Sequence, residues 1–587
     1  MSTEKNDFFK NEVLGHPAGL FVLFFTEMWE RFSYYGMRAL LILFLVAKVS
    51  DGGWGWERSE AYALFGWYVM LVYFLPLLGG WVADNKWGHV KTVIVGAAII
   101  TIGHASMAVA DLQVGMDLKF MFYIGLFLIV LGTGLFKPNM SSTVGKMYPP
   151  QSDKKDGAYT IFYMGVNSGA FIGTLLVGWI GETFSWTFGF GLAGIFMFFG
   201  LLQFYFARSI FGEEASTPKL KGVETTKEKE IKVPFTSTDN ILSLIGGVLA
   251  VTWIVEGITA VVTRGYHFLP QTFFGYNISV GFVLFLVSIV IFVILGFSRL
   301  KRFDSTERDR LKVIFIIAFF VIFFWASFEQ AGTTMNIFAR DYTNRNLAGN
   351  WALIYKIIDF ILSVAPMAVL TWVIYKLAKS IIKIFPLTIL FTSISFTIIW
   401  ALVIYRVYDK ITGDSALVDT SWFQILNPVF IISLAPLYSK FWEKYKFSGP
   451  QKFFGGFTLL AIGFGMLVIG ASSIPPGAKT ASVSMIWLIL AFLFHTMGEL
   501  SIAPVGLSYV SKLAPARMLG FIFGIWYLFI GLSGKLASIM AEYSDSIANE
   551  SGFSGFFLIF TVIPFVAGLF MLALNKPIKR MMHGIDK

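Results

Sequence analysis

Residues 20–47 read LFVLFFTEMWERFSYYGMRALLILFLVA, an apolar stretch that is interrupted near its middle by charged side chains. The charges are Glu27, Glu30, Arg31 and Arg38. About 20 apolar residues suffice for a helix to cross a bilayer. A charge at the bilayer centre costs about 2.5–3.5 kcal/mol on insertion scales, so a cluster of this kind indicates a functional site that faces a polar cavity.

One face of this predicted helix gathers most of its polar side chains. At 3.6 residues per turn, that face carries Glu27, Arg31, Tyr34, Tyr35 and Arg38, and Glu30 lies beside it. We therefore expect this face to point into a cavity and the other faces to pack against lipid or neighbouring helices.

The composition of the 587-residue chain is typical of a membrane protein. Hydrophobic residues make up 56% and charged residues 14%, against about 25% charged residues in soluble domains. Apolar runs predict about 16 spans. They are 18–48, 60–82, 92–111, 119–145, 158–182, 187–207, 239–263, 276–298, 312–338, 352–375, 384–407, 420–441, 453–471, 483–511, 518–543 and 555–575. The predicted fold class is an all-α polytopic membrane protein.

Several chemistries are disfavoured. The chain has no cysteine, and its six histidines are scattered without metal-ligand spacing. No nucleotide-binding or nucleophile motif stands in a fitting context. We expect no enzymatic activity, no metal and no cofactor.

The net charge of +10 is explained by membrane topology. An even number of spans places both termini on one side. If that side is the cytoplasm, most Lys and Arg fall in cytoplasmic loops, as the positive-inside rule predicts. The main basic clusters are 219–232, 299–312, 376–383 and 440–452. We expect a multi-pass protein of the cell (inner) membrane, surrounded by lipid, with no nucleic-acid partner.

The spans fall into groups. The polar segment 208–238 follows the sixth span and is interpreted as a cytoplasmic linker. Setting aside two extra helical hairpins leaves six spans and six more, an internal repetition typical of secondary transporters. The predicted segments are an N-terminal six-helix bundle (1–210), the linker with an extra transmembrane hairpin (211–311), a C-terminal six-helix bundle (312–340 and 419–587) and an inserted hairpin (341–418).

A loop motif narrows the choice among helical membrane-protein folds. Residues 79–92, GGWVADNKWGHVKT, resemble the GxxxDxxG-basic loop of the major facilitator superfamily. Its glycines allow close helix approach, and Asp84 can accept backbone donors at the start of the next helix. The resemblance implies the superfamily fold of two six-helix bundles, here with two extra hairpins.

The charged helix carries a more specific resemblance. Residues 27–35 resemble the ExxERFxYY signature of the proton-coupled oligopeptide transporter (POT/PTR) family. Residues 162–170 and 328–333 resemble its fifth-helix and seventh-helix signatures, and 137–139 (KPN) and 498–500 (GEL) also fit. The resemblance covers both bundles. It implies a proton-coupled symporter that imports di- and tripeptides by alternating access.

The resemblance also implies individual roles. Arg38 and Lys137 would face the peptide carboxylate, while Glu499 would hold the amino terminus, so that walls of opposite charge orient a zwitterion. The implied substrate-binding residues are Arg38, Lys137, Tyr34, Tyr35, Tyr73, Tyr163, Asn167, Trp325, Asn427, Glu499 and Trp526. The implied proton-coupling residues are Glu27, Glu30, Arg31, Lys137 and Glu329. The driving force would be a proton gradient.

Glu30 is the central candidate for a proton switch. In its deprotonated form it would hold a cation, either Arg31 or Lys137, and protonation would release that cation so that peptide competes for the site. A static ion pair that only locks helix packing is the alternative reading.

Two alternatives to peptide symport stay open: a family relative that transports another small anion or a peptide-like compound, and a non-transporting peptide sensor.

The insertion 341–418 departs from what the family leads us to expect. Within it, Lys356 and Asp359 are expected to pair with each other. His495, one turn before Glu499, is interpreted as a packing residue with satisfied hydrogen bonds, and tuning of the Glu499 pKa is the alternative. We expect the protein to bind peptides and protons and to work as a monomer.

Overall fold

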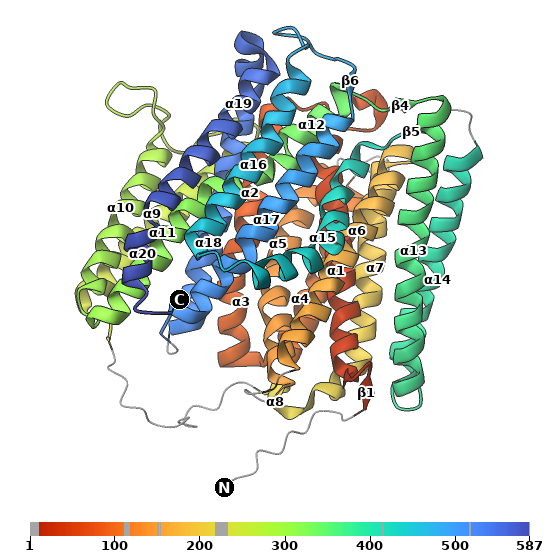
Figure 1. Ribbon diagram of the computed structural model, residues 1–587, viewed down its shortest axis with the longest axis horizontal. Helices are drawn as coiled ribbons and strands as arrows, with labels where there is room; N and C mark the ends of the chain where they lie inside the picture. Colours follow the sequence, from red (N-terminus) through yellow and green to blue (C-terminus); the bar gives the residue numbers. More distant parts are fainter. Residues whose placement is uncertain are drawn as a thin grey trace.

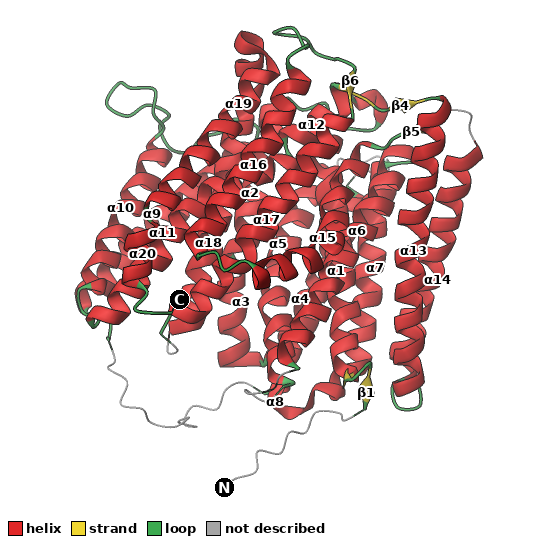
Figure 2. Cartoon of the chain, in the orientation of Figure 1, coloured by secondary structure: helices red, strands yellow, loops and turns green. Residues whose placement is uncertain are grey.

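The computed structural model describes residues 11–585 except 111–117, 149–151, 153, 218–232, 413–415 and 516–517. Half of the predicted linker 208–238 thus lies outside the described residues. The described chain is a bundle of long helices, with strands only as short two-residue pairs near its two ends (Figures 1 and 2).

The first helices form one group in the chain. They are α1 (Ala18–Val46), η1 (Val49–Asp51), α2 (Arg58–Phe74), α3 (Pro76–Val82), η2 (Ala83–Trp87), α4 (His89–Val109), α5 (Lys119–Lys146), α6 (Lys155–Thr183), α7 (Trp186–Ala207), η3 (Arg208–Phe211) and α8 (Gly212–Ser216). A hairpin of α9 (Ser237–Val262) and α10 (Val280–Leu300) follows. We refer to α1–α7 as the first half.

The second half consists of the helices from α11 to α12 and from η5 to α20. Its helices are α11 (Ser305–Phe328), η4 (Glu329–Gly332), α12 (Thr334–Asp341), η5 (Thr420–Ile425), α15 (Leu426–Lys444), α16 (Gly449–Ala471), α17 (Ile486–Leu513), α18 (Leu519–Glu542), α19 (Ser544–Ala573) and α20 (Asn575–Met581). The inserted hairpin is α13 (Gly349–Ile381) and α14 (Pro386–Thr412). The strand pairs are β1 (Glu12–Val13) with β2 (His16–Pro17), β3 (Thr343–Asn344) with β6 (Val483–Ser484), and β4 (Asn346–Leu347) with β5 (Ala416–Leu417).

The fold-class prediction is confirmed. Fifteen helical segments of the described chain are long and apolar enough to cross a membrane. α1 is 29 residues long but is not among the fifteen, because it contains too many charged residues for a purely apolar span. Adding α1 to the fifteen gives sixteen spans, and each coincides with a predicted one.

Both ends of the described chain lie on one side of the bundle. Asn11 donates a hydrogen bond to Ser380 O at the end of α13 (3.0 Å), and His583 lies 3.2 Å from Asp309 near the start of α11. We call this the terminal side. The opposite side, where α1 ends and α2 begins, is called the distal side.

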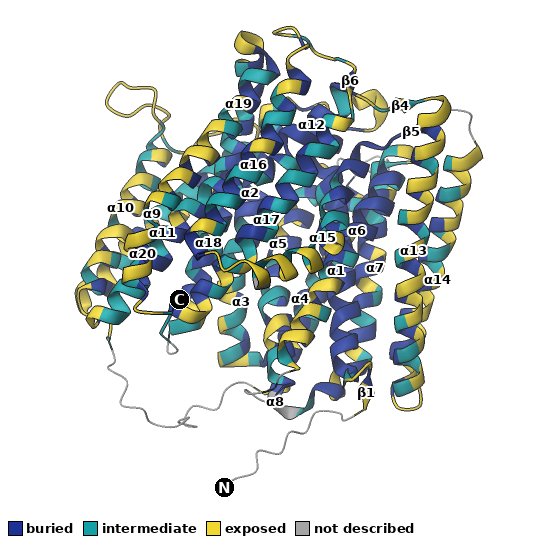
Figure 3. Cartoon of the chain, viewed as in Figure 1, coloured by how far each residue is buried: buried dark blue, intermediate teal, exposed yellow. Residues whose placement is uncertain are grey.

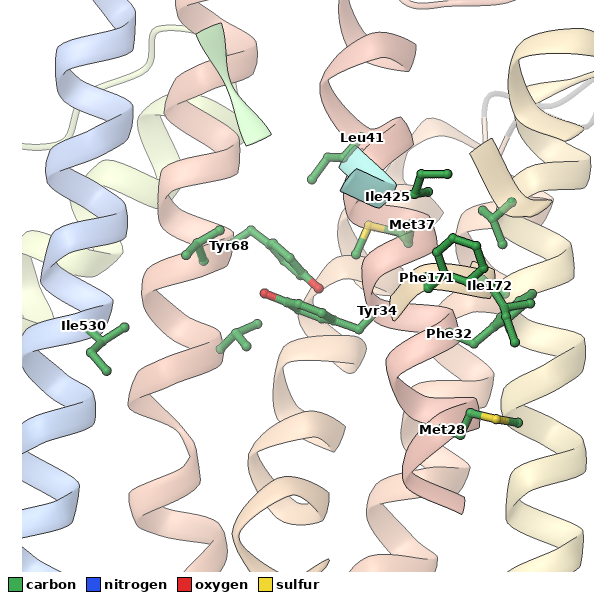
Figure 4. Packing of buried hydrophobic residues seen from close by; sticks show 14 of the residues in the cluster. Met28, Phe32, Tyr34, Met37, Leu41, Tyr68, Phe171, Ile172, Ile425 and Ile530 are labelled. Atoms are coloured by element: carbon green, nitrogen blue, oxygen red, sulfur yellow. The ribbon is translucent and has the colours of Figure 1, made fainter. Parts of the chain in front are cut away.

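The charged helix α1 lies in the interior and packs tightly on α6. Gly165, Gly169 and Gly173, spaced four residues apart on α6, each face an α1 backbone carbonyl so closely that a Cβ would lie within 2.9 Å of it. Small residues at this spacing let two membrane helices approach closely. Figure 3 shows α1 and α6 largely buried and α10, α13 and α14 exposed at the edges. Figure 4 shows apolar side chains of both helices meeting beside this contact.

The two halves contact each other on the distal side. Arg58 of α2 lies 2.7 Å from Asp341 of α12 and 2.8 Å from Asp545 of α19. Ser538 of α18 donates a hydrogen bond to Tyr62 O of α2 (2.5 Å). These contacts join helices of the first half to helices of the second half.

The inserted hairpin packs on the first half, although it belongs to the second half in the chain (Figure 1). Thr388 of α14 donates a hydrogen bond to Gln203 O of α7 (3.2 Å). The ring of Phe391 stacks on Phe206 of α7, with centroids 5.6 Å apart. The hairpin therefore reaches across from one half to the other.

The predicted pairing of Lys356 with Asp359 is wrong. Asp359 instead binds Arg406 of α14 through two hydrogen bonds of 2.5 and 2.9 Å. Lys356 donates to Ile411 O at 3.2 Å. Arg406 is fully buried and needs a counter-charge, because a buried ion without one is strongly destabilising. Helical spacing considers only partners on the same helix, and so it missed the neighbouring helix.

Candidate functional site

A cavity of about 1000 Å³, including its open mouth, lies between the two halves. Its wall in the first half is formed by Tyr35, Arg38, Tyr73, Tyr163, Val166, Asn167, Ala170 and Thr174. Its wall in the second half is formed by Trp325, Phe328, Glu329, Ala331, Gly332, Gln424, Asn427, Pro428, Ile431, Phe492, His495 and Glu499. Aromatic rings with polar tips alternate with a few charges, which suits loose recognition of varied side chains.

An ion pair spans the cavity from one half to the other. Arg38 of α1 pairs with Glu329 of the second half, and the guanidinium also lies 5.3 Å from the Phe65 ring centroid. Glu329 is placed there because the span 305–341 is not one continuous α-helix: η4 interrupts it between α11 and α12. Such interrupted helices line binding cavities in transporters.

A single carboxylate lies on another part of the wall. Glu499 of α17 accepts a hydrogen bond from Asn427 Nδ2 of α15 (2.8 Å), which also donates to Thr496 Oγ1 (3.1 Å). No cation lies within ion-pair distance of Glu499 among the described residues. Its negative charge is thus available to a cationic group in the cavity.

A second charged group lies on α1, two turns nearer the terminal side. Arg31 Nε lies 2.8 Å from Glu27 Oε1 and 3.0 Å from Glu30 Oε2, and all three side chains are buried. The glycine contact of α6 runs beside this group, because a Cβ at Gly169 would lie 2.9 Å from Arg31 Cβ. The group has two carboxylates and one guanidinium, so it carries one negative charge in excess when both are ionised.

Lys137 lies between these groups without a direct ion pair to either. Its ammonium sits 4.5 Å from the Tyr73 ring centroid and 5.9 Å from that of Tyr527. A cation over an aromatic face is stabilised by the ring quadrupole. Since Tyr73 lines the cavity and Tyr527 belongs to the second half, Lys137 lies at the boundary between the halves.

Comparison with known proteins decides the family. The model of the POT family matches residues 90–399 and 375–559. The chain belongs to the POT family. It is 31% identical to the peptide transporter YePEPT of Yersinia enterocolitica, over 100% of this chain and 99% of the relative. It is 30% identical to a di-/tripeptide transporter of Lactococcus lactis subsp. cremoris, over 97% of each chain.

Solved structures agree with this membership. A peptide transporter POT solved with sulfate has a TM-score of 0.68 and 28% identity, with 98% of each chain covered. A POT family transporter solved with a thioalcohol-conjugated peptide has a TM-score of 0.70 and 25% identity, covering 96% of this chain and 97% of the other. The protein is therefore a multi-pass membrane transporter of the POT family, which is not a family of enzymes.

Most of the residues implied by the POT resemblance line the cavity. Those that do are Tyr35, Arg38, Tyr73, Tyr163, Asn167, Trp325, Asn427 and Glu499, together with the proton candidate Glu329. Lys137, Tyr34 and Trp526 are not part of the lining. The proton candidates Glu27, Glu30 and Arg31 do not line it either, so only the Tyr35–Arg38 part of the polar face of α1 reaches this cavity. Tyr34 points from α1 towards Tyr68 of α2, with ring centroids 6.1 Å apart (Figure 4). Trp526 is buried against Gly506 of α17.

The sequence analysis missed several lining residues. Gln424 precedes Asn427 by three residues, and Thr174 follows Asn167 by seven, so each lies on the same helical face as a residue that was selected. That periodicity could have found both. Phe492 has no such signal, because an apolar residue in an apolar helix is indistinguishable from the core.

His495 is tightly packed, as the sequence suggested, but the expected hydrogen bonds of its ring are not made in the described structure. Its ring lies 4.4 Å from the Phe464 ring, and a Cβ at Gly463 would lie 2.4 Å from His495 Cδ2. The residue is only 2% exposed, and both ring nitrogens are buried without a hydrogen-bond partner in the described structure. The imidazole thus fills space between α16 and α17.

Proposed function

We propose that this protein is a proton-coupled symporter that imports di- and tripeptides by alternating access. The observation that carries the proposal is one cavity between the two halves that contains both the Arg38 guanidinium and the Glu499 carboxylate. A short peptide has a carboxylate and an ammonium at its ends, and charges of opposite sign on two walls select its orientation.

The two ends of the peptide meet different environments. The ammonium takes the place of a missing counter-ion at Glu499, assisted by the amide of Asn427. The carboxylate needs Arg38, which Glu329 already holds. Binding therefore requires that Glu329 give up the guanidinium, and protonation of Glu329 removes the competing charge.

The second charged group on α1 offers another place for a proton. Glu30 and Glu27 share the single guanidinium of Arg31. Neutralising Glu30 leaves Glu27 and Arg31 as a balanced pair, so a proton can bind there without leaving an unpaired charge in the membrane interior. Lys137 interacts electrostatically with Glu30, and its ammonium lies over the ring of Tyr73 in the cavity wall, so it links this group to the cavity.

Alternating access uses the contacts between the halves. The Arg58 ion pairs with Asp341 and Asp545 join the halves on the distal side. In the opposite state these pairs separate and the terminal side closes. With both termini in the cytoplasm and the protein in the cell membrane, that exchange carries the cavity from the outside to the inside.

The test is uptake by purified protein in vesicles. With an inward proton gradient, labelled dialanine is expected to accumulate above its external concentration, and a protonophore is expected to abolish the accumulation. Saturable dialanine binding without flux would show a sensor instead. Flux of a small anion with no response to dialanine would show a different substrate.

A further inference from the structure

A carboxylate of the first half takes the place of a helix cap in the second half. Glu182, at the distal end of α6, accepts hydrogen bonds from the backbone amides of Thr420 and Ser421, each 2.8 Å long. These two residues begin η5, which continues into α15. The first amides of a helix have no partner within the helix, so they need an acceptor from elsewhere.

The residue that would normally cap this helix is turned away. Asp419 occupies the N-cap position of η5 but makes no side-chain cap hydrogen bond. Aspartate is among the preferred N-cap residues, because its carboxylate can accept the amide of the second or third helical residue, here Ser421 or Trp422. Here Asp419 Oδ1 lies 2.8 Å from Lys410 Nζ, and Oδ2 lies 3.6 Å from Arg406.

Both cations belong to α14 of the inserted hairpin. Arg406 is itself held by Asp359 of α13, so the buried charges tie the hairpin to the start of η5. The hairpin thereby withdraws Asp419 from its own helix. Glu182 of the other half accepts the Ser421 amide in its place, together with the Thr420 amide.

The contact is close as well as polar. A Cβ at Gly178, one turn before Glu182, would lie 2.4 Å from Ser421 Cβ. The distal end of α6 therefore rests directly on η5. Any opening of the halves on the distal side must pull Glu182 away from both amides.

We propose that Glu182 is a gating residue, a helix cap exchanged between the two halves, and that the inserted hairpin strengthens this gate by sequestering Asp419. The proposal rests on the alternating access described above. When the gate opens, η5 loses its cap from Glu182, and Asp419 can replace it only by leaving Lys410. The hairpin thus shifts the equilibrium towards the state that is closed on the distal side.

The test measures gate opening without using transport. The chain has no cysteine, so spin labels can be attached specifically at Val49→Cys and Tyr543→Cys, which are 74% and 62% exposed on the distal ends of the two halves. In the substrate-free protein in lipid nanodiscs, Glu182→Ala is expected to raise the ratio of long to short label distances about fivefold, the usual effect of losing a cap. Glu550→Ala, an exposed carboxylate of α19, is the matched control and is expected to change nothing.

A double variant separates a cap exchange from a simple loss of contact. Lys410→Met frees Asp419 to cap η5 in the open state, so this variant alone is expected to raise the open fraction. Added to Glu182→Ala, where Glu182 no longer favours the closed state, Lys410→Met is expected to cause no further opening. The proposal is overturned if Lys410→Met alone leaves the label distances unchanged, if Lys410→Met opens the Glu182→Ala protein further by the same factor, or if Glu182→Ala leaves the distances unchanged. If Glu182→Ala does not fold, Glu182→Gln, which keeps one acceptor oxygen, is expected to give a smaller increase, and no increase overturns the proposal.

This readout is independent of the substrate. A protein that accumulates no dialanine but whose label distances respond as expected would refute the proposed function and leave the gate standing. If the wild-type protein transports dialanine but the label distances are unchanged in Glu182→Ala, the proposed function is supported and the gate is refuted.

Discussion

The two charged groups of α1 differ in where their partners lie. Arg31 is bound by Glu27 and Glu30, which are on the same helix, whereas Arg38 is bound by Glu329 of the other half. The first group can change its charge while the halves stay still. The second cannot change its partner unless Glu329 is neutralised, a substrate intervenes or the halves move. One helix thus carries a group suited to respond to protons and another suited to respond to the position of the halves.

The largest effect is expected at the pair between the halves. Arg38→Ala leaves Glu329 buried without a cation, which costs about 3–5 kcal/mol, so thermal stability should fall and dialanine counterflow should drop at least about 100-fold. The double variant Arg38→Ala with Glu329→Ala removes the unpaired charge and should recover stability but not transport. Recovery of transport as well would mean that Arg38 does not bind the substrate.

The next effect tests the group that stays within one helix. Glu30→Gln should abolish the response to a proton gradient, which for one proton amounts to about tenfold accumulation per pH unit. Counterflow, which needs no net proton movement, should persist because Glu27 still balances Arg31. Loss of both activities with reduced thermal stability would favour the static ion pair, and intact accumulation would exclude Glu30 as the proton site.

A third prediction concerns the carboxylate that has no cation. Glu499→Gln should raise the KM for dialanine about 10- to 100-fold, because hydrogen bonds to charged groups contribute about 1.5–3 kcal/mol. N-acetylated dialanine lacks the ammonium and serves as the control, since its weak uptake should be unaffected. An equal loss for both substrates would place the peptide amino terminus elsewhere.

The smallest effect is expected at the tyrosines between the two charged groups. Tyr34→Phe should change the KM within about twofold, because its hydroxyl is buried without a hydrogen-bond partner in the described structure and faces α2. Tyr35→Phe removes a polar group from the cavity wall and should weaken binding about two- to tenfold. The reverse order would show that Tyr34 turns into the cavity during transport.

The sequence predicted the spans well because each is a continuous apolar run, and span length is set by the bilayer. It also singled out α1 as the candidate functional helix, since charges in such a run are costly and therefore informative. The partners of buried charges were harder to predict from the sequence. Arg406 and Asp359 are 47 positions apart in the chain, and only the packing of α13 on α14 brings them together.

In the candidate site too, helix packing decided which individual residues reach the cavity, and the sequence could not predict this. Tyr34 and Tyr35 are adjacent and were both assigned to substrate, but the helix turns one towards α2 and the other into the cavity. Trp526 was assigned by resemblance and is buried against α17. A step of one residue rotates a side chain by about 100° around a helix, so small differences in helix orientation decide which residue is accessible.

By itself, the sequence determined that this is a polytopic helical transporter and that the 27–38 segment of α1 places charges inside a membrane span, because hydrophobicity and charge are local properties of the chain. Only the tertiary structure decided that Arg38 binds Glu329 while Arg31 stays with Glu27 and Glu30. It alone also decided that the inserted hairpin lies on the first half and leaves the cap of η5 to Glu182. Buried charges must find partners, but which partner is within reach depends on how distant helices pack.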